Sequence, residues 1–136
     1  MTREHWLEHN TPMAEVFFCD KINNGQLILV ADGTYIPCEK SSNHQFQRET
    51  WLDQKKYNCI KPFIICTCDG KIVTIEGPFK ATENDATIIQ LILKAKHLEG
   101  LIQPGDIFVV DRGFRDAIEV LTVQHNLTVK SPECNL

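Results

Sequence analysis

The stretch LILVAD at residues 27–32 places five apolar residues before an aspartate, and IFVVD at residues 107–111 nearly repeats it. Apolar runs of this length without polar alternation predict strands that are buried on both faces of a sheet. A fully buried lone carboxylate is costly, so we expect Asp32 and Asp111 at the points where the two strands leave the core. Each aspartate is then either a turn former or one half of a site.

The composition is that of a single globular domain. The chain has 136 residues, of which 43% are hydrophobic and 24% are charged. No apolar run is long enough to span a bilayer, and the opening MTREHWLEHN lacks the apolar core of a secretory signal, so we expect an intracellular protein. Six cysteines without regular spacing are expected to be core residues and not zinc ligands.

The chain is acidic, with a net charge of −4 and a pI of about 5.7. Contacts with phosphates require Lys and Arg, so this balance argues against a free-standing nucleic-acid binder. An acidic total is still compatible with a local basic stripe, or with a cluster of metal-binding carboxylates.

The order of the predicted elements indicates a mixed α/β fold. Thr11 and Pro12 predict the start of a short helix. The later pattern predicts a polar loop over 39–56, a hairpin over 57–76, a helix over 84–98 with a Thr82–Asp85 capping box, a helix over 115–125 and a strand over 127–130. We therefore expect a helical lead-in over residues 1–26 and a core over residues 27–136, with helices on the faces of a mixed sheet.

In such folds ligands gather at the carboxyl ends of the strands. If the two apolar strands are parallel neighbours, Asp32 and Asp111 stand side by side. Adjacent carboxylates repel unless a cation lies between them, and Mg²⁺ or Mn²⁺ prefers oxygen ligands. The pattern therefore suggests metal-assisted chemistry on phosphodiesters.

Several short motifs occur in a specific order: ADGT after the first apolar strand, KSSN with FQR, DGKI at the hairpin, GP before NDA, and VDRGF. Over residues 27–126 the chain resembles the DDE superfamily endonuclease domain of PIF/Harbinger-type transposases. The resemblance implies a ribonuclease-H-like fold, a divalent metal cofactor, Mg²⁺ or Mn²⁺, a DNA partner and a nuclear location.

The resemblance also assigns residues. Asp32 and Asp111 match the family's catalytic, metal-binding aspartates, and Asp85 in NDA matches a further metal ligand. From its position alone, Asp85 serves equally well as a helix cap. The family's last catalytic Glu lies in a helix after the final core strand, and no Glu here matches it. We therefore expect a nuclease core that is incomplete at its C-terminus and lacks the usual N-terminal DNA-binding module, which a separate DNA-binding protein could replace.

Two alternatives stay open. One is a catalytically inactive remnant, or a domesticated DNA- or protein-binding module of the same fold. The other is a metal-free structural domain whose aspartates only cap turns.

A basic stripe follows the first aspartate. Five basic residues stand against two acidic ones over residues 40–61, namely Lys40, Arg48, Lys55, Lys56 and Lys61. The stripe is either a solvated loop or a contact surface for the DNA backbone, and the resemblance favours backbone contacts for Arg48, Lys55 and Lys56. Arg112 and Arg115 flank Asp111 and pair either with it or with phosphate.

Overall fold

The computed structural model describes residues 2–19, 25–52 and 57–131. Strand β1 (Ile28–Gly33) lies inside the sheet, as its apolar sequence predicts. Leu27, Ile28 and Leu29 have no exposed surface. Val30 is partly exposed, and Asp32 is the exposed residue of the strand, so the core ends where the sequence turns polar.

The sheet around β1 is mixed. Strands β4 (Tyr57–Thr67) and β5 (Ile72–Lys80) form an antiparallel hairpin, and β4 pairs antiparallel with β1. On its other side β1 pairs in parallel with β6 (Ile107–Val109), which pairs in parallel with β7 (Thr128–Lys130). The hydrogen-bonded order is therefore β5-β4-β1-β6-β7, which confirms the predicted mixed, ribonuclease-H-like sheet.

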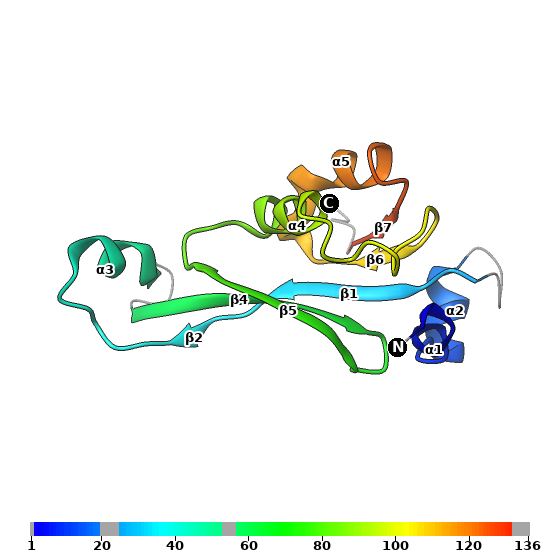
Figure 1. Cartoon of the computed structure of the whole chain (residues 1–136), viewed down its shortest axis with the longest axis horizontal. Helices are drawn as coiled ribbons and strands as arrows, with labels where there is room; N and C mark the ends of the chain where they lie inside the picture. The colour runs from blue at the N-terminus through cyan, green and yellow to red at the C-terminus, as the bar shows by residue number, and fades with distance from the viewer. Residues whose placement is uncertain (1, 20–24, 53–56, 132–136) are drawn as a thin grey trace, which may run out of the picture.

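The helices after the hairpin lie over one side of this sheet, as Figure 1 shows. They are α4 (Asp85–Lys94), the 3₁₀ helix η1 (Arg112–Ala117) and α5 (Ile118–Val123). The predicted helix over 84–98 ends earlier than expected, and the one over 115–125 begins as a 3₁₀ turn. None of the helices in the described ranges is long and apolar enough to cross a membrane.

The buried contacts between these helices and the sheet are aromatic and aliphatic. The rings of Phe63 on β4 and Phe114 on η1 lie 5.8 Å apart, and both side chains are fully buried. Ile88, Ile89 and Ile92 on α4 join the same cluster. This packing fixes the helices relative to the ends of β1 and β6.

The hairpin extends the molecule into an arm. Strands β2 (Ile36–Pro37) and β3 (Trp51–Leu52) pair with the first part of β4, and α3 (His44–Thr50) lies at the end of the arm (Figure 1). The predicted loop over 39–56 is therefore wrong for residues 44–52. Asn43 caps α3 by accepting a 3.0 Å hydrogen bond from the Phe46 amide. Thr50 is its only buried residue, so the helix shows little apolar periodicity in the sequence.

The hairpin also differs from its prediction in length. Strand β5 continues past the expected end at residue 76, through the cis Gly77–Pro78 peptide, to Lys80. Strand β4 lies between β1 and β5, so Pro62 is at neither an edge nor an entry. The β4–β5 register shifts between Lys61 and Phe63, which leaves Pro62 out of that ladder.

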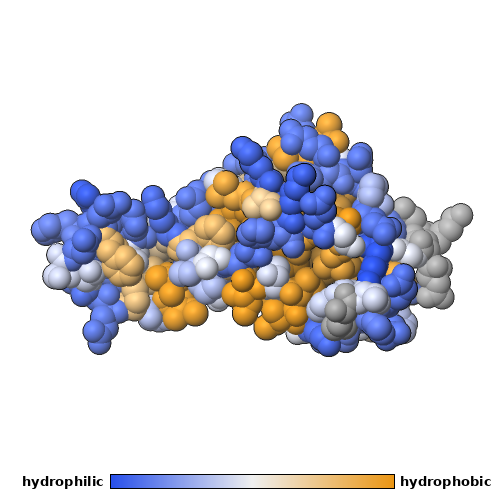
Figure 2. All heavy atoms as spheres, viewed as in Figure 1, coloured by the Kyte–Doolittle hydropathy of each residue, from blue (hydrophilic) through white to orange (hydrophobic). Residues whose placement is uncertain are grey.

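The outer surface is mixed in polarity. Figure 2 shows polar residues around α3 and α5, and apolar residues over the middle of the molecule, where β5 lies. On β5 the side chains of Ile72 and Ile75 are 51% and 59% exposed. One face of the hairpin is therefore apolar and open to solvent.

The N-terminal helices α1 (Arg3–Leu7) and α2 (Pro12–Phe18) lie at the other end of β1 (Figure 1). Thr11 caps α2 as predicted, accepting a 3.2 Å hydrogen bond from the Ala14 amide. Arg3 donates to both carboxylate oxygens of Asp106, at 2.6 and 2.7 Å, and Asp106 is 1% exposed. Asp106 also accepts from the amides of Leu27 and Gln103. This ion pair ties α1 to the starts of β1 and β6.

We expect Asp106→Ala to lower the free energy of unfolding by about 3–5 kcal/mol, because Arg3 and two backbone amides would lose a buried partner. Urea unfolding followed by circular dichroism measures this change. Asp116→Ala, at an exposed position, is the control. A loss no larger than that of the control would contradict a stabilising role for this ion pair.

Candidate metal centre

Asp32 and Asp111 lie at the same edge of the sheet. The parallel register pairs Val30 of β1 with Val109 of β6, and each aspartate follows its paired valine by two residues. The two strands are thus parallel neighbours, which is the condition for Asp32 and Asp111 to stand side by side. Both aspartates are exposed, in agreement with the high cost of burying an unpaired carboxylate.

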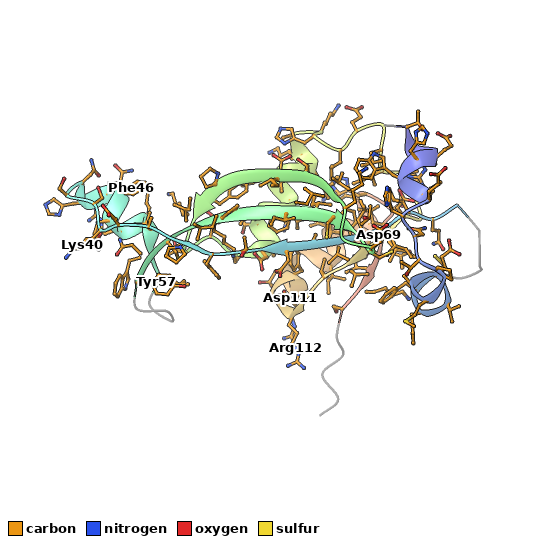
Figure 3. The ribbon with its side chains drawn as sticks, turned by 90° about the horizontal axis from the view of Figure 1, so that it is seen from below. Lys40, Phe46, Tyr57, Asp69, Asp111 and Arg112 are labelled. Carbon is orange, nitrogen blue, oxygen red and sulfur yellow. The ribbon has the colours of Figure 1, made fainter. Side chains whose placement is uncertain are left out.

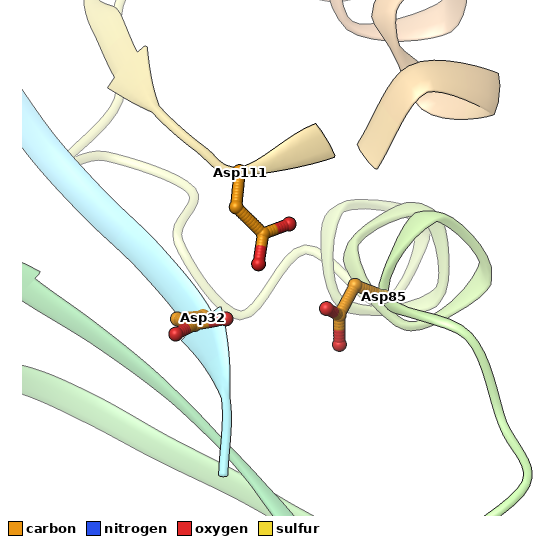
Figure 4. Close-up of side chains that lie close together, drawn as sticks. All are labelled: Asp32, Asp85 and Asp111. Atoms are coloured by element: carbon orange, nitrogen blue, oxygen red, sulfur yellow. The ribbon is translucent and has the colours of Figure 1, made fainter. Parts of the chain in front are cut away.

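Asp85 reaches the same place from the first turn of α4. The predicted capping box is wrong, because Asn84 is the N-cap and accepts a 2.8 Å hydrogen bond from the Thr87 amide. Asp85 follows the cap as the first helical residue, so its carboxylate is not needed for capping. Figure 4 shows Asp32, Asp85 and Asp111 converging from three separate elements.

The three carboxylates are close enough to share a cation. One oxygen of each lies within 4.8 Å of the others. Burial, followed by the negative charges of Asp111 and Asp85, raises the pKa of Asp32 above its ordinary value, against the opposing effects of the Gly33 amide and Lys61. Carboxylate oxygens are the ligands that Mg²⁺ and Mn²⁺ prefer, so this set of donors fits a divalent metal ion.

The described cysteines and histidines form no comparable group. Among the residues that the structure describes, the three aspartates are the one set of three or more possible ligands close enough to hold an ion. Cys59 is buried, and Cys66 and Cys68 are partly buried. The expectation of core cysteines therefore holds for Cys59, while Cys134 lies outside the described residues.

Lys61 contacts the centre from β4, and its predicted place in the basic stripe is wrong. It is 4% exposed, so it does not belong to a solvated basic stripe. Its ammonium nitrogen lies 2.8 Å from Oδ1 of Asp85 and donates a 2.9 Å hydrogen bond to the Glu83 carbonyl. Burial alone lowers the pKa of Lys61, but the hydrogen bond and charge of Asp85 outweigh this and raise it overall. Lys61 is therefore a buried cation beside the carboxylates.

A signal for Lys61 was present in the sequence. Cys59, Lys61 and Phe63 alternate along β4 and are all buried on the same side of the strand. A lysine at an inward position of a strand needs an acidic partner inside the fold. That pattern, once the strand was assigned, would have separated Lys61 from the surface lysines.

Two glycines allow the carboxylates to approach the backbone. A Cβ atom on Gly33 would lie 2.5 Å from Cε of Lys61 and 2.6 Å from Oδ1 of Asp85. A Cβ atom on Gly113 would lie 3.1 Å from Oδ1 of Asp111 and 3.3 Å from Oδ2 of Asp85. The glycines of the ADGT and VDRGF motifs thus both border the acidic centre, which gives these motifs a steric basis.

The remaining basic residues are not gathered at the carboxylates. Arg48 is exposed on α3, in the arm, and Figure 3 shows Lys40 and Phe46 there, away from Asp111. Lys55 and Lys56 lie outside the described residues. Arg112 and Arg115 are both exposed, and within the described part of the chain neither forms an ion pair with Asp111. Arg112 projects outward beside Asp111 in Figure 3.

A mixed sheet of this order, with carboxylates at the ends of β1 and β6, defines a ribonuclease-H-like domain of the nuclease type. The model of the DDE superfamily endonuclease family matches residues 31–135, so the chain belongs to that family. Members of the family use divalent metal ions, in keeping with the acidic group here. A search of curated proteins gives no match.

The fold is similar to that of a solved transposase. The cryo-EM structure of a piggyBac transposase synaptic complex with hairpin DNA aligns with a TM-score of 0.52 and 14% identity. The alignment covers 81% of this chain and 24% of that chain. At this identity the likeness shows the fold, and the chain corresponds to less than a quarter of the transposase.

We expect Gly33→Ala to destabilise the protein by about 1–3 kcal/mol, because the new methyl group would displace the Lys61–Asp85 pair. Chemical unfolding of the metal-free protein measures the change. Thr34→Ala, at the exposed neighbouring position, is the matched control. If both variants unfold at the same urea concentration as the wild type, the close approach at Gly33 is not a constraint.

We expect Asp32→Asn to stabilise the protein in EDTA by up to about 1 kcal/mol, because it relieves repulsion among three partly solvated carboxylates. The same variant should lose the increase in melting temperature that Mn²⁺ gives the wild type. Thermal unfolding with and without Mn²⁺ checks both results. Asp116→Asn should behave as the wild type, and an Asp32→Asn protein that Mn²⁺ still stabilises would contradict the assignment.

Proposed function

We propose that the chain is the nuclease core of a PIF/Harbinger-type transposase and binds Mg²⁺ or Mn²⁺ to act on the phosphodiester bonds of DNA. The observation that carries the proposal is the convergence of Asp32, Asp85 and Asp111 within 4.8 Å, on three elements that packing holds in place. Family membership and the shared motifs support it. A nuclear location follows from the same assignment.

In this proposal Asp32 and Asp111 are the catalytic ligands and Asp85 is the third metal ligand. The strand ends and the first turn of α4 fix their separation before the ion binds, which limits the reorganisation needed on binding. A bound divalent ion supplies polarisation of a phosphoryl oxygen and stabilises the developing charge. The nucleophile is water or a 3′-hydroxyl of DNA.

Contacts with the DNA backbone are assigned to basic residues outside the acidic centre. Arg112 and Arg115 follow Asp111 by one and four residues and are exposed, and we assign them to contacts with phosphate. Arg48, on α3 in the arm, is proposed to contact the backbone further away, and Lys55 and Lys56 are proposed as further backbone contacts. A net charge of −4 means that such contacts are local and that binding weakens steeply with salt.

The division into a lead-in over residues 1–26 and a core over residues 27–136 is part of the same proposal. The similar piggyBac structure is a synaptic complex with DNA, and it contains much more chain than the region matched here. We infer that target recognition depends on a DNA-binding module, in the same polypeptide or in a partner protein.

A second candidate is a DNA- or protein-binding module of the same fold that does not cleave. It is favoured by the state of Asp85, because one of its oxygens is already paired with Lys61. A centre in which one aspartate is partly neutralised by an ion pair, while the other two form none with the described residues, could bind an ion without supporting hydrolysis. The two candidate functions share the fold and differ in whether DNA is cleaved.

Nicking of supercoiled plasmid in Mn²⁺ distinguishes the candidates. The nuclease assignment predicts that the wild type converts supercoiled DNA to open circles, and that Asp32→Asn and Asp111→Asn reduce this to background. Asp116→Asn, at an exposed position of η1 outside the group of three carboxylates, should retain full activity. Mn²⁺-dependent stabilisation without nicking would support the binding module. If Mn²⁺ causes no stabilisation and no nicking, the result contradicts the proposed metal centre.

A further inference from the structure

The ammonium of Lys61 is an internal feature of the fold. Its neighbours on the same face of β4, Cys59 and Phe63, have no exposed surface. A buried ammonium is stable only when its charge and its hydrogen-bond donors are matched. Here Asp85 supplies the charge at 2.8 Å and the Glu83 carbonyl accepts a hydrogen bond at 2.9 Å, while the Tyr35 ring centroid lies 5.3 Å from the nitrogen.

The partners of Lys61 lie just before and at the start of α4. Glu83 and Asp85 flank Asn84, which caps the helix. One side chain on β4 therefore fixes both the approach to α4 and its first residue. This arrangement links the position of the Asp85 carboxylate to the sheet that carries Asp32.

The two oxygens of Asp85 have different surroundings. Oδ1 is buried, and its charged partner is the Lys61 ammonium at 2.8 Å. Oδ2 lies on the side of Gly113, whose Cβ position is 3.3 Å from Oδ2 and 3.1 Å from Oδ1 of Asp111. Lys61 thus holds one oxygen of Asp85 while the other lies toward the segment that carries Asp111.

The charge of Lys61 also matters. Three carboxylates carry a formal charge of −3, and Lys61 reduces it to −2, which one divalent ion balances. The same positive charge repels an incoming cation. Lys61 can therefore favour metal binding only through an effect other than its charge, and this effect must outweigh the repulsion.

We propose that Lys61 is a positioning residue of the metal centre: it holds Asp85 in the orientation that binds a divalent ion. The inference rests on the metal centre of the proposed function. If Lys61 acted only through its charge, its removal would tighten metal binding. If it acts by holding Asp85, its removal weakens metal binding, so the two effects have opposite signs.

Calorimetric titration of the full chain with MnCl₂ tests the inference. Lys61→Met keeps most of the side-chain volume and removes the charge, and we expect it to raise the Kd for Mn²⁺ about 10–100-fold, as loss of a ligand's supporting partner does. Lys80→Met is the matched control, because Lys80 is exposed on the neighbouring strand. It should leave the Kd unchanged.

A double-mutant cycle separates positioning from general damage to the fold. Lys61 is expected to act only through Asp85, so Lys61→Met should cause no further weakening in an Asp85→Asn background. Circular dichroism and urea unfolding establish that each variant is folded. If Lys61→Met does not fold, Lys61→Gln, which retains a donor for the Glu83 carbonyl, takes its place with the same expected weakening.

The outcomes are distinct. A wild type that binds no Mn²⁺ contradicts the proposed metal centre and this inference with it. A wild type that binds Mn²⁺, together with a folded Lys61 variant of equal or higher affinity, contradicts the positioning role alone. Additive losses in the double variant also contradict it, because Lys61 would then act through groups other than Asp85.

Discussion

The parallel pairing of β1 with β6 is the constraint on which the placement of Asp32 beside Asp111 depends. Both strands are short, buried and apolar, and their register places two aspartates from distant parts of the sequence beside one another. A shift of one residue in this register would move the side chains of one strand to the opposite face. The apolar residues of the two strands therefore determine the separation of the carboxylates of Asp32 and Asp111.

The third carboxylate depends on a different interaction. Helix α4 packs on the sheet through its isoleucines, and its first turn is fixed by the Asn84 cap and by the contacts of Lys61. The register of the strands thus positions Asp32 and Asp111, and the placement of α4 positions Asp85. Apolar packing away from the carboxylates holds these like charges close together. Such electrostatic strain is common at ligand-binding sites.

Much of this arrangement follows from local sequence, and some of it does not. The strand ends at Asp32 and Asp111 are visible as apolar runs closed by an acid, because burial dictates their composition. Helix α3 is not visible, because a helix with one buried residue has no apolar period to detect. The predicted capping box is wrong because Thr82 and Asn84 both resemble caps, and only the hydrogen bond that Asn84 accepts from the Thr87 amide distinguishes them. The burial of Lys61 requires knowing that β4 is an internal strand.

Strand β4 carries Lys61 near its middle and pairs with β2 and β3 at its opening residues, in the arm. Lys61 stands where the β4–β5 ladder changes register, beside a proline that takes no part in that ladder. One continuous strand therefore joins the distal arm to the ammonium group that contacts Asp85.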